Sequence, residues 1–169
     1  MPLFQQIESV PGPFEDSLQQ RAKVKHFRDS LSAPVSNHAL AVDELQFQIF
    51  AHMPNWVNQL MELRNHMVKL LGFNTGEDTM APKQTPLNVG DTAGFLTVIE
   101  KTEDEMISES DDPHMTFYLS VKKVKDRVVV STLVNPKTWI GRAYLRVILP
   151  FHYVIARSVI QSALSNHRI

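Results

Sequence analysis

Residues 137–166 read KTWIGRAYLRVILPFHYVIARSVIQSALSN. Apolar side chains recur in this stretch every three or four residues, a spacing that places them on one face of an α-helix. The residues on this face are Ile140, Tyr144, Val147, Ile148, Phe151, Val154 and Ile155. Those on the opposite face are Arg142, Arg146, Tyr153 and Arg157. The pattern predicts one long amphipathic helix that lies against an apolar surface, with a kink at Pro150, because proline removes a backbone hydrogen bond.

The residues before this helix have a period of two, which is typical of β-strands. We predict four strands, at Ala93–Lys101, Glu105–Ser110, His114–Lys123 and Arg127–Val134. Short turns separate them, and short turns favour antiparallel hairpins over helical crossovers. This part of the chain therefore predicts an antiparallel sheet.

The first part of the chain begins with a segment rich in proline and glycine. Residues 1–20 are expected to be an extended or disordered lead-in to a single domain over residues 21–169. Alternation in Arg21–Arg28 predicts a short strand, and the prolines and polar residues of Ser30–Ala41 predict a loop.

Two helical segments follow this loop. We expect the first to begin at a capping Asp43 and to reach Phe50, and the second to cover Trp56–Leu71 and to end at Gly72. The turn-rich segment Phe73–Gly90 that follows predicts either a lid over a binding site or a mobile surface connection.

This order of elements predicts an α+β domain in which a curved antiparallel sheet packs on the long C-terminal helix, with two shorter helices after the first strand. Such a layout buries one face of the sheet and leaves the other in water, where we expect Thr116 and Tyr118. The space between a curved sheet and its helix is a natural place for a pocket.

The composition argues against several classes of protein. The 169 residues, 43% of them hydrophobic, suit one globular domain, and the lack of cysteine excludes disulfides, thiolate metal sites and thiol catalysis. The balance of 17 basic and 18 acidic residues argues against nucleic-acid binding. No stretch approaches the roughly 20 apolar residues of a membrane span, since Val147–Ile160 is interrupted by Pro150, His152 and Arg157. Without a signal-peptide pattern, we expect a soluble cytoplasmic protein.

Two segments resemble a known family: MPNWVNQLMELRNHMVKLLG at residues 53–72 and GRAYLRVILPFHYVIAR at residues 141–157. The matching residues are Pro54, Trp56, Leu60, Leu63, Arg64, Gly72, Gly141, Arg142, Tyr144, Pro150, Phe151 and His152. Together they resemble the bacterial family of domain of unknown function 2867, from roughly Val24 to the C-terminus. The resemblance implies a fold similar to the Bet v 1/START-like helix-grip superfamily. It implies no established activity and therefore no catalytic residue, and by analogy of fold it suggests an apolar, lipid-like ligand.

We expect a ligand cavity between the sheet and the C-terminal helix, with the Phe73–Gly90 loop as its gate. Methionine among the candidates suits varied apolar ligands, because its side chain adapts its shape. The candidate cavity residues are Phe95, Met106, Met115, Phe117, Leu119, Tyr144, Ile148, Phe151, His152 and Arg64.

His152 and Arg64 each have a functional and a structural interpretation. His152 could contact a ligand or transfer a proton, or it could donate to a carbonyl freed by Pro150 or to the preceding loop. Arg64 could bind a ligand carboxylate or phosphate, or it could pair with an acid or lie over Trp56. No histidines have the spacing of helical metal ligands and no nucleophile motif occurs, so we predict no metal, cofactor or catalytic residue.

The expected partner is a small apolar ligand, without nucleic acid or a membrane span. Homo-oligomerisation stays open. An enzyme that acts on a small hydrophobic substrate in the same cavity and a protein-interaction domain are the alternatives.

Overall fold

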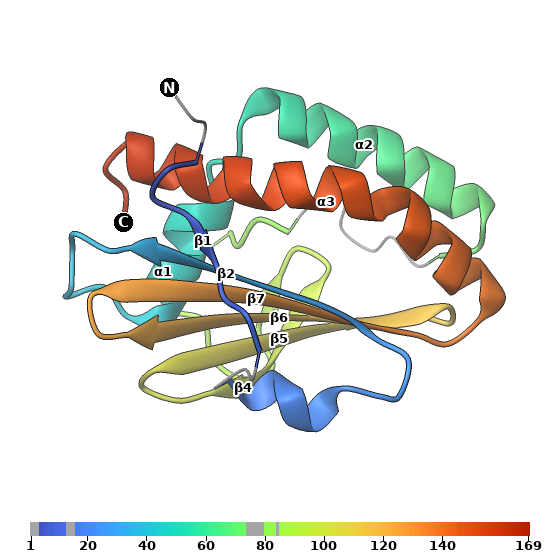
Figure 1. The fold of residues 1–169 in the computed structure, drawn as a ribbon, viewed down its shortest axis with the longest axis horizontal. Coiled ribbons are helices and arrows are strands. Elements are labelled where there is room, and N and C mark those ends of the chain that lie inside the picture. The colour runs from blue at the N-terminus through green and yellow to red at the C-terminus, as the bar shows by residue number, and fades with distance from the viewer. Residues whose placement is uncertain (1–3, 13–15, 74–79, 84) are drawn as a thin grey trace.

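The structure is a computed structural model that describes residues 4–12, 16–73, 80–83 and 85–169. In these residues seven antiparallel strands form one sheet in the order β1-β2-β7-β6-β5-β4-β3 (Figure 1). The strands are β1 (Glu8–Ser9), β2 (Phe27–Pro34), β3 (Thr92–Ala93), β4 (Leu96–Lys101), β5 (Glu105–Asp111), β6 (Met115–Val124) and β7 (Arg127–Pro136). The helices are η1 (Ser17–Arg21), α1 (Val42–Phe50), α2 (Asn55–Leu70) and α3 (Trp139–Ser165).

The helices divide between the two faces of the sheet. Figure 1 shows α2 and α3 on one face and the short η1 on the other. The predicted fold class is confirmed: a curved antiparallel sheet packs on a long C-terminal helix, and two shorter helices follow the first strand of the domain.

The first long strand, β2, lies further along the chain than its predicted position. It covers Phe27–Pro34 instead of Arg21–Arg28, so it occupies part of the predicted loop. Phe27, Asp29 and Leu31 face the helices, while Ser30 on the other face shares a hydrogen bond of 2.8 Å with Ser131 of β7. The polar residues of this segment looked like a loop because their partners lie on a strand a hundred residues away.

The helix α3 begins at Thr138, whose side-chain oxygen accepts the Gly141 N–H at 3.2 Å. It continues through Pro150, and Figure 1 shows its first half bending toward the sheet. By length and composition alone α3 would suffice to cross a membrane, and 17% of its apolar 18-residue stretch is buried. Toward its C-terminal end Val159, Ile160 and Ala163 are buried in the core.

The main core lies between α1, the C-terminal half of α3 and the inner face of the sheet. Leu45 and Ile49 of α1, Leu119 and Val121 of β6 and Ile160 of α3 are all at most 2% exposed. Because this core lies at one end of the sheet and the start of α3 packs near its other end through Gly141, the middle of α3 and most of α2 have few buried residues.

The outer face of the sheet is covered in part, contrary to the expectation that it faces water. Leu18 of η1 is fully buried against Ile107 and Leu133, and Tyr118 packs beside them. Burial and a hydrogen bond with Glu109 raise the pKa of Tyr118. Thr116 is also buried. The lead-in segment, through η1, supplies this cover.

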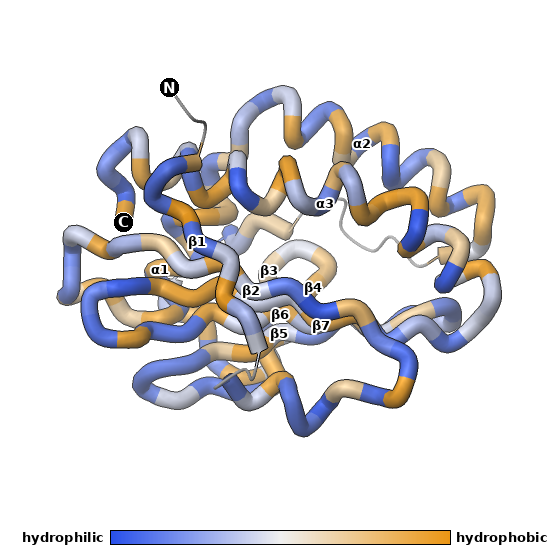
Figure 2. The backbone as a smooth tube through the Cα atoms, viewed as in Figure 1, coloured by the Kyte–Doolittle hydropathy of each residue, from blue (hydrophilic) through white to orange (hydrophobic). Residues whose placement is uncertain are grey.

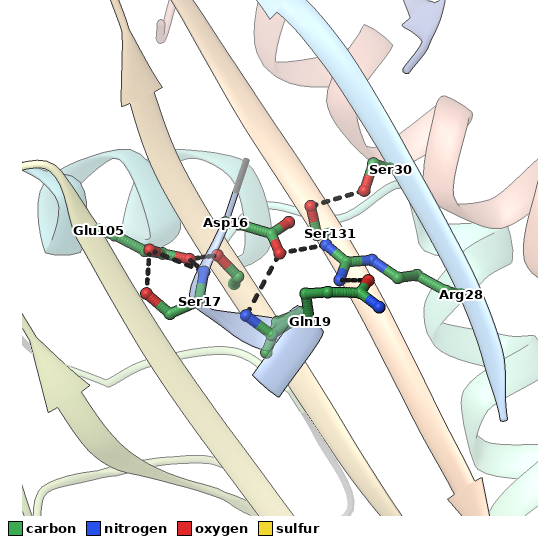
Figure 3. A network of polar contacts seen from close by, with 9 residues as sticks. Asp16, Ser17, Gln19, Arg28, Ser30, Glu105 and Ser131 are labelled. Carbon is green, nitrogen blue, oxygen red and sulfur yellow. Dashed lines mark hydrogen bonds and ion pairs between the residues drawn. The ribbon is translucent and has the colours of Figure 1, made fainter. Parts of the chain in front are cut away.

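Two carboxylates hold η1 in place on the outer face (Figure 3). Asp16 forms an ion pair with Arg28 of β2 and accepts the Leu18 N–H at 3.2 Å. Glu105 of β5 accepts the Ser17 backbone N–H at 3.2 Å and the Ser17 hydroxyl at 2.9 Å. Acceptors at the first turn of a helix satisfy its free N–H groups, so these contacts fix η1 to two strands.

The predicted strand Ala93–Lys101 is a hairpin. β3 ends at Ala93, β4 begins at Leu96, and these two residues are paired across the turn. Gly94 has a φ of +63°, which glycine adopts without strain. The turn places Phe95 over the inner face of the sheet, where its ring lies 6.4 Å from that of Phe117.

Candidate functional site

A cavity of about 440 Å³ lies between the inner face of the sheet, α2 and α3. Its floor is formed by side chains from β2, β6 and β7, and its walls by the facing sides of the two helices. The residues of the floor include Phe27, Leu31, Met115, Phe117, Leu119, Val130 and Val134. Those of the walls include Val57, Leu60, Met61, Leu63, Met67, Val68, Leu145, Ile148, Phe151, Ile155 and Val159. Apolar side chains therefore dominate the lining.

The cavity exists because α2 and the middle of α3 stand off the sheet: in α3 no residue between Gly141 and Val159 is buried. Within α2 only Val57, Asn65 and Val68 are buried. His114, in the turn before β6, bridges the helices: its Nε2 lies 3.1 Å from the carbonyl oxygen of Leu71 and its Nδ1 lies 2.9 Å from the hydroxyl of Thr138. This bridge ties the end of α2 to the start of α3 at one end of the cavity.

The cavity opens between the two helices. Leu63 and Met67 of α2 and Val147 and Phe151 of α3 line it, yet they are 51–63% exposed. Figure 2 shows hydrophobic residues recurring along both helices. Exposed apolar side chains at the edge of an apolar cavity are typical of an entrance for a ligand.

Methionine is concentrated in the lining. Five of the seven methionines of the chain line the cavity: Met53, Met61, Met67, Met80 and Met115. Methionine has an unbranched, polarisable side chain that adapts to ligands of different shapes.

Arg64 of α2 brings a positive charge into this apolar lining. Its Nε donates to the hydroxyl of Tyr144 at 2.8 Å, and its Nη1 donates to Oδ1 of Asn65 at 2.8 Å. The guanidinium carbon lies 5.8 Å from the ring centres of both Phe95 and Tyr144. Within the described residues no carboxylate lies within 4.0 Å of Arg64. The rings that Arg64 contacts there are those of Phe95 and Tyr144, in place of the expected Trp56.

His152 and Asp29 form a second polar group in the lining. Nε2 of His152 lies 3.2 Å from Oδ2 of Asp29, and the side chains are 20% and 13% exposed. The His152 ring also stands edge-on to Phe27, with ring centres 5.4 Å apart. The expectation of a carbonyl freed by Pro150 as its partner is therefore wrong: the partner is a carboxylate on β2, which connects the sheet to α3.

Asp112 and Asp111 lie in the turn at the end of β5. Asp112 lines the cavity and its Oδ1 accepts the His114 N–H at 2.9 Å. Asp111 faces solvent, and hydrogen bonds from Lys137 and Thr116 hold the pKa of its carboxyl below the ordinary value of 3.8. The Lys137 bond, at 2.7 Å, ties this turn to the segment that leads into α3.

Most of the residues proposed from the sequence lie in the lining. Those that line the cavity are Phe95, Met115, Phe117, Leu119, Tyr144, Ile148, Phe151, His152 and Arg64. Met106 does not line the cavity. It lies on the face of β5 that is turned toward the helices, but near the start of the strand, where it is fully buried against Val42, Leu87 and Val98. The same side of β5 reaches the cavity only four residues later, at Ser110.

The sequence reasoning missed Asp29 and, apart from Arg64, the residues that α2 contributes to the lining. Asp29 was overlooked because its strand was placed too early in the chain. The apolar residues of α2, such as Leu60 and Met67, were recognised as one helical face, but nothing in the sequence alone showed which surface that face lines.

The segment Phe73–Gly90, predicted as a gate, is described only in part, because residues 74–79 and 84 lie outside the described residues. Phe73 and Met80 line the cavity. Further on, Leu87 is fully buried, its N–H donates to Oδ2 of Asp43 at 3.0 Å, and its carbonyl accepts Nζ of Lys101 at 2.7 Å. Asp43 therefore anchors this segment and does not cap α1, whose N-cap is Ala41.

Among the described residues no group of three or more histidine, aspartate or glutamate side chains could hold a metal ion.

The family model described as protein of unknown function (DUF2867) matches residues 21–159, and the chain belongs to this family. No curated protein and no solved structure matched the chain.

Proposed function

We propose that this protein binds a small, largely apolar or lipid-like molecule in the cavity between the sheet, α2 and α3. The observation that carries the proposal is a cavity of about 440 Å³ with an almost entirely apolar lining. Pockets for small ligands have volumes of about 300–1,000 Å³ and combine such a lining with a few polar groups.

The packing of the helices supports a binding role. A domain of this size buries most of its large apolar side chains, yet Leu63, Met67, Val147 and Phe151 are exposed around the cavity. A ligand that covers part of these surfaces gains roughly 25 cal/mol for each Å² of apolar area removed from water. The helix-grip layout resembles that of the Bet v 1/START-like superfamily, and this analogy also favours binding of an apolar ligand.

The His152–Asp29 pair favours a second candidate function, acid–base chemistry on a small hydrophobic substrate in the same cavity. His152 and Arg64 would not act on one atom. Tyr144, which holds Arg64, and His152 are eight residues apart on α3, or about 12 Å along the helix axis. Conversion of a bound compound by the wild-type protein, lost in His152→Gln, would show that the cavity is catalytic.

The binding proposal is tested by native mass spectrometry of gently purified protein and by titration with 1-dodecanol, a neutral single-chain probe. We expect a bound species of small mass or saturable binding of the probe. Ile148→Trp fills the cavity from α3 and should weaken binding at least tenfold. Ala143→Trp adds the same ring at an exposed position of the same helix and should leave binding unchanged.

Two results would contradict the proposal. One is the absence of both a bound species and saturable binding of any single-chain probe. The other is an equal loss of affinity in the two tryptophan variants, which would show that the probe does not occupy the cavity.

A further inference from the structure

We infer that the ligand carries one anionic head group, a carboxylate or a phosphate, and that Arg64 binds it. This inference rests on the proposed function and adds the chemical class of the ligand. It starts from the contrast between the charge of Arg64 and the apolar lining around it.

The guanidinium of an arginine carries a permanent positive charge in a protein. Arg64 is partly buried, and taking such a cation even partly out of water is costly unless an opposite charge or hydrogen-bond acceptors replace the water. Contacts with the Phe95 and Tyr144 rings compensate only part of this cost, because cation–π contacts are worth about 0.5–2 kcal/mol.

The protein itself supplies no counter-ion in the part of the chain that the structure describes. Two neutral oxygens, the Tyr144 hydroxyl and the Asn65 amide oxygen, accept from Nε and Nη1. Nη2 has no hydrogen-bond acceptor among the described residues. The two described carboxylates in the lining are engaged elsewhere, Asp29 with His152 and Asp112 with the His114 N–H.

The two contacts also orient the guanidinium. Tyr144 holds the Nε side from α3 and Asn65 holds Nη1 from α2, so the planar group is fixed between the helices. A guanidinium fixed in this way donates parallel N–H groups to the two oxygens of a carboxylate or phosphate. Fixing the group before the ligand arrives reduces the entropy that binding costs.

The position of Arg64 also fits a head group with an apolar chain behind it. Its partner Tyr144 is the first α3 residue in the lining, and the lining continues along the helix to Ile160. Tyr144 and Ile160 are sixteen positions apart, which corresponds to about 24 Å of helix. Along α3 most of the lining therefore lies on one side of the charge, while along α2 Arg64 stands midway in the lining from Val57 to Leu71. The longer α3 side offers apolar surface for the chain of an amphipathic anion.

The test compares four compounds with the same chain: dodecanoate, dodecyl phosphate, 1-dodecanol and dodecyltrimethylammonium. Calorimetric titration of the full chain should show at least one of the two anions binding ten times or more as tightly as the alcohol, and the cation binding most weakly. Whichever anion binds more tightly identifies the head group as carboxylate or phosphate.

Variants then assign the preference to Arg64. Arg64→Gln should reduce the affinity for the anion to that for 1-dodecanol while the affinity for 1-dodecanol stays the same. Arg64→Lys should keep part of the preference, because it keeps the charge. Arg146→Gln removes an exposed arginine of α3 that does not line the cavity, and should change neither affinity.

Equal affinities of the wild-type protein for anions and alcohol would overturn the inference and leave the proposed function standing. Equal loss of both affinities in Arg64→Gln would also overturn it, since the arginine would then act on packing alone. If none of the four compounds binds, the inference fails, and if native mass spectrometry also shows no bound species, the proposed function fails with it. Because the comparison of compounds uses the wild-type protein, it decides the matter even if Arg64→Gln does not fold.

Discussion

Replacing Gly141 by alanine should destabilise the junction between the sheet and α3. A Cβ atom at this position would lie 2.2 Å from the carbonyl oxygen of His114 and 3.0 Å from its carbonyl carbon. Ordinary contact begins near 3.4 Å, so the backbones must separate by roughly 1 Å. The His114 oxygen cannot easily move, because it accepts the N–H groups of Lys137 at 2.8 Å and Thr138 at 3.4 Å.

The size of the effect follows from two opposing contributions. Forcing an extra methyl group into a packed position costs about 1–3 kcal/mol, and a weakened hydrogen bond at His114 adds about 1 kcal/mol. The higher helix propensity of alanine stabilises the helix by about 1 kcal/mol relative to glycine. We therefore expect Gly141→Ala to lower the free energy of unfolding by about 1–3 kcal/mol.

Urea unfolding followed by circular dichroism measures this change. Ala143→Gly, at an exposed position of the same helical turn, serves as the control. It should cost about 1 kcal/mol from propensity alone. If Gly141→Ala proves as stable as the wild type or more stable, then α3 does not approach His114 as closely as the structure shows, and the reasoning is refuted.

Two further predictions concern the outer face and the turn at the end of β5. Leu18→Ala removes a fully buried side chain of η1. It should lower the free energy of unfolding, measured in urea, by about 2–5 kcal/mol. A change below about 0.5 kcal/mol would show that η1 does not cover the sheet in solution. The hydrogen bond from Lys137 is the main reason why the folded-state pKa of Asp111 lies below its ordinary value of 3.8. The ion pair therefore stabilises the fold fully above pH 3.8, and this stabilisation is lost as the pH falls through the folded-state pKa. Asp111→Asn should therefore be slightly less stable than the wild type at pH 7, by under about 1 kcal/mol because the pair is exposed, and the difference should shrink toward pH 3; a difference independent of pH would contradict this account.

Much of the fold was visible in the chain itself. The period of three to four residues located α1, α2 and α3 to within two residues at each end, because one face of each helix is apolar. The period of two located β5, β6 and β7, whose side chains alternate between a helix-covered and an outer face. The strand β2 was misplaced because Ser30 and Ser32 gain their buried positions only through pairing with β7.

The site was predictable in its general position and not in its contacts. A long helix opposite a curved sheet indicated where a cavity would lie, and nine of the ten candidate residues line it. Met106 has the same alternation as the lining residues, and only its distance along β5 removes it from the cavity.

The sequence by itself determined which segments are helices and strands, because that choice depends on the spacing of apolar residues within about ten positions along the chain. Only the tertiary structure decided which other segments each helix and strand contacts. The contacts of Arg64 with Tyr144, of His152 with Asp29 and of η1 with the outer face join residues about 80 to 120 positions apart. No local pattern encodes such pairs, since they form only when the sheet closes and brings distant strands and helices together.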